Sequence, residues 1–277
     1  MGLLAGVPLI GAGQKLDTPP PGDWTCPMDP DYHSDKPGVC PRCGMKLLVK
    51  VPDRVEYPLE LSQSPEILKP GDTARLKFRI VDPGGKPVRA FETVHEKLMH
   101  LFVVSENLDF FAHVHPVFQA DGSFDLAIRL PYGGMYRLLS DYYPQGSVPQ
   151  LAVQTLYVAG KSEPARLVEA MAPQKAANLG AALHLDPSPI LAGFESKLFY
   201  ELSPSEGLEP YLGAWGHMLA VSEDLIDMMH QHPFLLTGST VQFNVIFPRP
   251  GLYKIWTQFQ RQSVVNTIVF TVPVQAL

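Results

Sequence analysis

Two short segments of the sequence each place two histidines two positions apart, directly before a proline. FFAHVHP contains His113 and His115, and MMHQHP contains His230 and His232. Side chains alternate along a β-strand, so both members of a pair point to the same face, with Cα atoms about 6.5–7 Å apart. Imidazoles at this spacing can chelate one ion, and both zinc and copper accept them. The pairs therefore predict metal binding.

A third histidine precedes each pair on a neighbouring predicted strand. His100 lies in LMHLFVVS, which the turn SENLD joins to the first pair. Directly opposed residues on paired strands have Cβ atoms about 5 Å apart, so His100 can lie across from the pair. A single strand histidine is more often an ordinary core or surface residue, but six of the nine histidines recur in this arrangement. We predict two three-histidine sites: His100, His113 and His115 in the first, and His217, His230 and His232 in the second.

The repetition extends beyond the histidines. Residues 100–136 and 217–253 align at a fixed offset of 117 without a gap. A long gapless match of this kind indicates that the two halves are duplicated copies. Eleven positions are identical: His100, Val104, Ser105, Glu106, Leu108, His113, His115, Pro116, Pro131, Gly134 and Tyr136.

A candidate fourth ligand differs between the copies. Asp141 in the first copy corresponds to Gln258 in the second. Asp141 could donate an oxygen to the first site or orient one of the ligating histidines. Gln258 is neutral, and Met228 adds a soft thioether near the second pair. We therefore expect the first site to prefer zinc or Cu(II), and the second to favour Cu(I) or to be empty.

All three cysteines lie in one segment, WTCPMDPDYHSDKPGVCPRCGMKLLV, at residues 24–49. The Cys-x2-Cys pair of Cys40 and Cys43 precedes a glycine that lets the backbone turn back, so both thiolates face one point. Such a short segment cannot bury a core and needs a covalent or metal link. A disulfide would leave one cysteine unpaired, whereas a metal can take Cys26, Cys40, Cys43 and one further ligand, either Asp29 or His33.

This segment resembles the small heavy-metal-binding domain of bacterial copper and silver efflux proteins and cation-transporting ATPases. The family pattern runs aromatic-x-C-P-M-H-P, a spacer, then P-G-x-C-P-x-C-G-M-x-L. This chain has Asp29 where the pattern has histidine, which leaves the fourth ligand open between Asp29 and His33. The remainder is similar to uncharacterised exported bacterial proteins that carry the same module. The resemblance implies metal ions, and metal-efflux or delivery proteins, as partners.

Short apolar runs separated by glycine and proline turns indicate an all-β chain. The sequence is 45% hydrophobic and contains 28 prolines and 22 glycines. We predict a small metal-stapled, zinc-ribbon-like module followed by two duplicated immunoglobulin-like β-sandwich domains. The predicted units are a signal-peptide remnant and linker at 1–23, the heavy-metal-binding module at 24–50, sandwiches at 55–160 and 181–277, and a partly helical linker at 161–180.

The net charge argues against nucleic-acid binding, and the hydropathy argues against a transmembrane segment. The net charge of −6 shows no basic patch, so nucleic-acid binding is not expected. No run approaches about 18 consecutive apolar residues, so no transmembrane segment is expected. The apolar start MGLLAGVPLIGAG is interpreted as the end of a secretory signal, which predicts a periplasmic or secreted bacterial protein. The alternative is an unstructured start of a cytosolic protein.

The predicted function is a non-catalytic protein that sequesters or delivers copper or zinc ions in the cell envelope. One alternative is a metal-dependent enzyme with a three-histidine centre. Its candidate general bases are neighbours in sequence only: His95, Glu96, Glu106 and Glu223. A blue-copper site is excluded from the sandwiches because they contain no cysteine. The other alternative is an adhesion or assembly module with structural metals.

Overall fold

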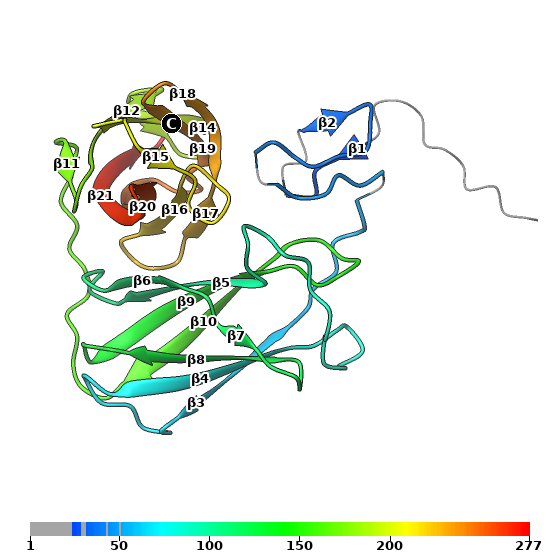
Figure 1. The fold of residues 1–277 in the computed structure, drawn as a ribbon. Coiled ribbons are helices and arrows are strands. Elements are labelled where there is room, and N and C mark those ends of the chain that lie inside the picture. Colours follow the sequence, from blue (N-terminus) through cyan, green and yellow to red (C-terminus); the bar gives the residue numbers. More distant parts are fainter. Residues whose placement is uncertain (1–23, 29–31, 43, 50) are drawn as a thin grey trace, which may run out of the picture.

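The computed structural model describes residues 24–28, 32–42, 44–49 and 51–277 (Figure 1). Its described part contains strands and turns but no helix, which confirms the all-β prediction. It accordingly offers no helix that could cross a bilayer. A small N-terminal module and two β-sandwiches make up the described chain.

The first sandwich packs two four-stranded sheets face to face. Apolar side chains alternate with polar ones along most strands, so each sheet has one face for the core. One sheet has the order β3 (Leu59–Ser64), β4 (Thr73–Ile80), β8 (Ser123–Arg129), β7 (Val117–Phe118). The other has the order β10 (Gln150–Val158), β9 (Gly134–Tyr142), β5 (Met99–Ser105), β6 (Phe111–Val114).

The second sandwich repeats this arrangement. One sheet has the order β11 (Gln174–Lys175), β12 (Gly180–Asp186), β14 (Glu195–Ser203), β19 (Thr240–Ile246), β18 (Pro233–Thr237). The other has the order β13 (Ile190–Leu191), β21 (Val264–Gln275), β20 (Gly251–Arg261), β16 (His217–Ser222), β17 (Met228–Gln231), with β15 (Leu208–Glu209) on β20. The strands β5, β6 and β9 thus correspond to β16, β17 and β20.

The connection between the sandwiches differs from the prediction. Residues 161–180 were expected to be partly helical, but they contain no helix. Instead β11 lies inside this range and pairs with β12. Pro164 and Pro173 lie in this range, and proline removes a helix hydrogen bond, which explains why the alanine-rich composition does not produce a helix.

Every residue of β5 is buried, because its two faces pack against different partners. Met99, Leu101 and Val103 belong to the core of the first sandwich. Phe102 and Val104, which alternate with them, belong to a separate apolar cluster that joins the sandwiches. Eight buried residues form this interdomain cluster: Phe102, Val104, Leu108, Leu139, Leu219, Val221, Leu225 and Trp256.

The interdomain cluster is self-complementary. Each member from the first sandwich has its partner at the offset of 117 in the same cluster, so that Phe102 corresponds to Leu219 and Leu139 to Trp256. The same surface of each copy therefore meets the other copy, which is the form of a two-fold interface. His100 and His217 lie on these same faces of β5 and β16.

The N-terminal module is a small ribbon. Its strands β1 (Trp24–Thr25) and β2 (His33–Ser34) pair, and bridges join Thr25 to Leu48 and Val39 to Lys46. Gly44 has a φ of 72° and donates its N–H to the Cys40 carbonyl at 2.8 Å. This is the tight turn that the Cys-x2-Cys-Gly sequence predicts.

Candidate metal centre

The first predicted group of histidines converges. The Nδ1 atom of His100 lies 3.0 Å from the Nε2 of His113 and 3.2 Å from the Nε2 of His115. Together the three imidazoles form a group whose ligand atoms lie within 4.8 Å of one another. β5 and β6 position them: Phe102 pairs with His113, and His100 precedes that pair by two residues, on the same face.

The other ring nitrogens of His100 and His113 are already engaged. The Nε2–H of His100 donates to the carbonyl of Val94 at 3.0 Å, and the Nδ1–H of His113 donates to Oε1 of Gln258 at 2.8 Å. A neutral imidazole carries one N–H, so the two nitrogens that approach to 3.0 Å both present lone pairs. Two lone pairs repel unless a cation lies between them.

The second copy repeats part of this arrangement. The Nε2–H of His217 donates to the carbonyl of Tyr211 at 3.0 Å, as His100 does to Val94. Nδ1 of His217, Nε2 of His230 and Nε2 of His232 are buried without a hydrogen-bond partner. These are the same three atoms that converge in the first copy. Buried polar atoms are normally satisfied, so three unsatisfied nitrogens together indicate a ligand position.

His95 belongs to the second group, although the sequence analysis did not predict it as a ligand. The imidazoles whose ligand atoms lie within 4.8 Å are His95, His217 and His232, rather than the predicted trio with His230. His230 is their neighbour, with its ring centroid 4.4 Å from that of His232. His95 comes from the first sandwich, and its Nε2 is also buried without a partner.

Two of the histidines donate hydrogen bonds to side chains of the opposite sandwich. Asp141 was predicted either to ligate the first site or to orient a histidine, and its Oδ2 accepts the Nδ1–H of His230 at 2.9 Å. It is therefore an orienting partner for the other copy and lies outside the first group. Gln258, which corresponds to Asp141, holds His113 in the same way. Its amide nitrogen lies 3.2 Å from Thr267 Oγ1, which keeps its oxygen toward the imidazole.

The two predicted sites form one centre instead of lying apart in separate domains. The ring centroids of His100 and His217 are 5.7 Å apart, and those of His113 and His217 are 5.3 Å apart. The cause is the docking of β5 and β6 against β16 and β17, which carries both histidine faces to the domain boundary. Met228, expected to offer a thioether, packs against the interdomain apolar cluster.

Burial keeps the histidines neutral. Burial, followed by the neighbouring His230, lowers the pKa of His100 to about 4. Burial likewise lowers the pKa of His95 and that of His115 to about 3, with His100 as the next cause in both. Neutral imidazoles are the form that binds metal, so the centre is prepared for a cation at neutral pH.

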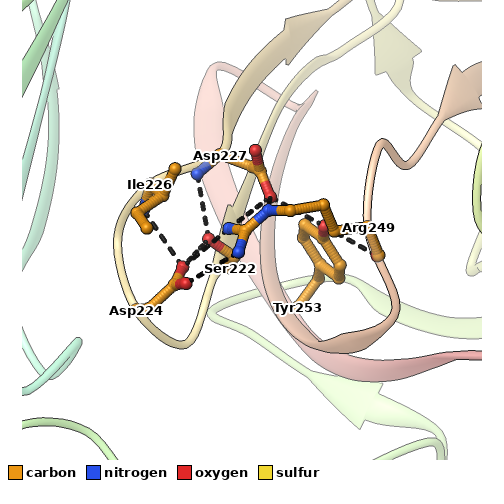
Figure 2. A network of polar contacts seen from close by, with 6 residues as sticks. All are labelled: Ser222, Asp224, Ile226, Asp227, Arg249 and Tyr253. Carbon is orange, nitrogen blue, oxygen red and sulfur yellow. Dashed lines mark hydrogen bonds and ion pairs between the residues drawn. The ribbon is translucent and has the colours of Figure 1, made fainter.

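Two of the carboxylates considered as general bases, Glu106 and Glu223, accept hydrogen bonds from the backbone. Glu106 accepts the N–H of Met135 at 3.3 Å, and Glu223 accepts the N–H of Leu167 at 2.5 Å. Asp224 and Asp227 lie in the loop that leads into β17. Both accept hydrogen bonds from Arg249, and Asp227 also accepts one from the hydroxyl of Tyr253 (Figure 2). This network fixes the start of the strand that carries His230.

Two of the predicted ligands of the N-terminal module, Cys26 and Cys40, offer sulfur atoms. Cys26 and Cys40 are buried in one apolar cluster, together with Val94 and Tyr143 of the first sandwich. Such donors fit a soft or borderline ion. His33 is exposed, and its Nδ1 lies 3.2 Å from the Thr25 hydroxyl. The other predicted ligands, Asp29 and Cys43, lie outside the described residues.

A pocket of about 430 Å3 joins the module to the histidine centre. Met28 of the module, Asp141 of the first sandwich and His230 and His232 of the second all line it. The guanidinium of Arg42 lies 4.2 Å from the ring centroid of Phe234, two residues beyond His232. The module is therefore docked beside the second histidine group.

Comparison with known families identifies both parts of the chain. The family described as Domain of unknown function (DUF8832) matches residues 51–159 and 176–276. The family described as Heavy metal binding domain matches residues 24–50, which confirms the resemblance drawn from the cysteine pattern. No curated protein matches the sequence.

Several solved structures are similar over most of this chain. The adhesin FdeC of Escherichia coli has 11% identity and a TM-score of 0.27, with 80% of this chain and 66% of the adhesin covered. Salmonella alpha-2-macroglobulin has 12% identity and a TM-score of 0.30, covering 79% of this chain but 15% of its own. Two fibronectin type-III domains of chicken tenascin have 12% identity and a TM-score of 0.23, covering 79% and 99%. This chain thus spans less than two thirds of the first two proteins.

Proposed function

Because the chain belongs to the family described as Domain of unknown function (DUF8832) and carries a heavy metal binding domain, we propose that it is a non-catalytic protein of the bacterial cell envelope. It sequesters or delivers copper or zinc, and the histidine centre between its sandwiches holds the metal. The envelope location rests on the apolar first residues and on the exported proteins that the sequence resembles.

One observation carries this proposal: the 3.0 Å approach of His100 Nδ1 to His113 Nε2. Both atoms present lone pairs, because the second nitrogen of each ring donates to an oxygen. Only a proton or a metal ion relieves the repulsion. Burial disfavours the proton by holding the pKa of His100 near 4, so at neutral pH the arrangement suits a metal ion.

The donor set indicates the class of metal. Imidazole nitrogen suits zinc and copper, whereas hard ions such as calcium and magnesium require oxygen ligands. Asp141 supplies a negative charge against the ring of His230, which strengthens that imidazole as a donor. Delivery is supported by the pocket, because Met28 and the pair His230 and His232 line the same space. A thioether can hold Cu(I) between a thiolate site and an imidazole site.

Elemental analysis of the full chain purified without added metal tests the proposal. We expect copper or zinc, and a loss of the histidine-bound fraction when His113→Ala is combined with His230→Ala. His184→Ala is the matched control, because His184 is exposed on β12, where its imidazole faces Glu201. Equal metal content in the double variant and the control would contradict the proposal.

An activity screen separates storage or delivery from catalysis. The metal-loaded chain should show no hydrolase or oxidase turnover above that of the double variant. Turnover that disappears with His113→Ala and His230→Ala would instead favour the metal-dependent enzyme. The adhesion alternative would be favoured if this chain bound a partner protein equally well with and without metal.

A further inference from the structure

Two equivalent turns meet between the histidine groups. Val94 bridges Lys97 in the first sandwich, and Tyr211 bridges Ala214 at the corresponding place in the second. The second residue of each turn has a left-handed backbone, with a φ of 48° at His95 and 49° at Leu212. The carbonyl of Leu212 accepts a hydrogen bond from the imidazole of His95, which shows that the turns are in contact.

The first of these turns reaches into the other sandwich's histidines. The ring centroid of His95 lies 3.8 Å from that of His232 and 5.2 Å from that of His217. Its Nε2 is buried without a hydrogen-bond partner, as are Nδ1 of His217 and Nε2 of His230 and of His232. Four imidazole nitrogens of this side of the centre are thus unsatisfied.

The second turn carries no such donor. At the position of His95 it has Leu212, whose side chain has no nitrogen. The first group therefore consists of His100, His113 and His115, with three nitrogens within reach of one ion. The two-fold relation that holds for the other six histidines fails at this one position.

We infer that the centre contains two metal sites of different coordination. The inference rests on the proposed function and adds a division of labour to it. His95, His217 and His232 have ligand atoms within 4.8 Å of one another, and the unsatisfied Nε2 of the neighbouring His230 adds a fourth nitrogen. Four protein ligands are the closed form typical of a retained zinc ion. His100, His113 and His115 leave one position open for water or an incoming ligand. The open site exchanges its ion, and the closed site keeps it.

The open position has a direct chemical consequence. An incoming donor can bind the ion at a three-nitrogen site before any imidazole leaves, so exchange requires no bare intermediate. At a four-nitrogen site an imidazole must dissociate first, and the surrounding protein holds it in place. The difference should therefore show in rates of release as well as in affinity.

Zinc release from the full chain to a chromophoric chelator tests the inference. We expect one fast and one slow histidine-bound phase, in addition to the phase of the N-terminal module, which Cys40→Ser identifies by removing it. His95→Leu, which copies the second turn, should make the slow phase at least about tenfold faster. An effect of that size already follows from the loss of partners that only orient ligands.

Leu212→His is the reciprocal variant, and it tests for a gain. Leu212 already has the backbone conformation of His95, so a histidine fits there without new strain. We expect it to slow the fast phase, a result that loss of folding cannot imitate. Unchanged release phases in both variants would overturn the inference while leaving the proposed function intact. Zinc bound only to the N-terminal module would overturn both.

Discussion

His113 of the first sandwich donates its Nδ1–H to Oε1 of Gln258 in the second, at 2.8 Å. The reverse bond runs from His230 to Asp141 at 2.9 Å. Each sandwich thus fixes the ring orientation and the tautomer of a histidine in the other. Metal binding and the docking of the two sandwiches are therefore coupled through the same two bonds.

Removing the charge of Asp141 and adding a charge at Gln258 should change zinc affinity in opposite directions. Asp141→Asn removes the carboxylate behind His230, and we expect weaker zinc binding at the second group, by about 10- to 100-fold. Gln258→Glu places a carboxylate behind His113 and should strengthen binding at the first group. Competition with a zinc chelator of known affinity measures both. Equal effects from both substitutions would contradict the cross-sandwich assignment.

Stability of the metal-free chain should fall in mild acid. The pKa of His95 and of His115 is lowered to about 3, and that of His100 to about 4, chiefly by burial. In the unfolded chain these residues titrate near 6.5, so between the two values the unfolded state binds more protons. Stability is therefore complete above pH about 6.5 and is lost as the pH falls toward 4 and below.

Urea denaturation between pH 7.5 and 4.5 measures this dependence. His95→Leu should flatten it, because one buried titrating group is removed. A midpoint that does not change with pH in the unsubstituted chain would show that the histidines titrate alike in the folded and the unfolded states.

The interdomain apolar cluster should determine both stability and metal binding. Trp256 is 4% exposed and stacks on Phe111 with a centroid distance of 5.1 Å. Trp256→Ala should cost about 3–5 kcal/mol of unfolding free energy and weaken metal binding at both groups. Tyr157→Ala is a suitable control, because Tyr157 is 68% exposed on β10. Thermal unfolding and zinc titration of both variants give the comparison.

The N-terminal module should depend on its own metal. Structural zinc contributes on the order of 10–16 kcal/mol to small units of this kind. Cys40→Ser with Cys43→Ser should remove one ion per chain and make residues 24–49 sensitive to protease. The histidine-bound metal should remain. Unchanged metal content and protease resistance would refute a metal-stapled module.

Much of the fold and part of the site follow from local sequence patterns. Strand alternation accounts for the faces of β5 and β16: Met99 and Met218 enter the sandwich cores, and His100 and His217 lie on the opposite faces. The offset of 117 correctly relates the copies. Strand alternation states which face a side chain occupies, but not what covers that face.

The joining of the two groups and the role of His95 could not be predicted from such patterns. Both depend on how the sandwiches dock, which is set by apolar residues far apart in the chain. His95 has leucine at the repeated position, so the comparison that selected the other six histidines passed over it. A histidine near the repeated histidines that is absent from the other copy, as His95 is, would have been the signal for this ligand.

The two-fold form of the interface makes the present chain resemble a symmetric dimer whose two subunits have been joined by a peptide link and have diverged in sequence. In a symmetric pair of separate chains, every substitution appears on both sides of the axis. Such a pair could have a histidine at both turns or at neither, and its two sites would remain alike. Joining the two copies in one chain removes that constraint. One residue difference, His95 against Leu212, then suffices to give neighbouring sites different coordination.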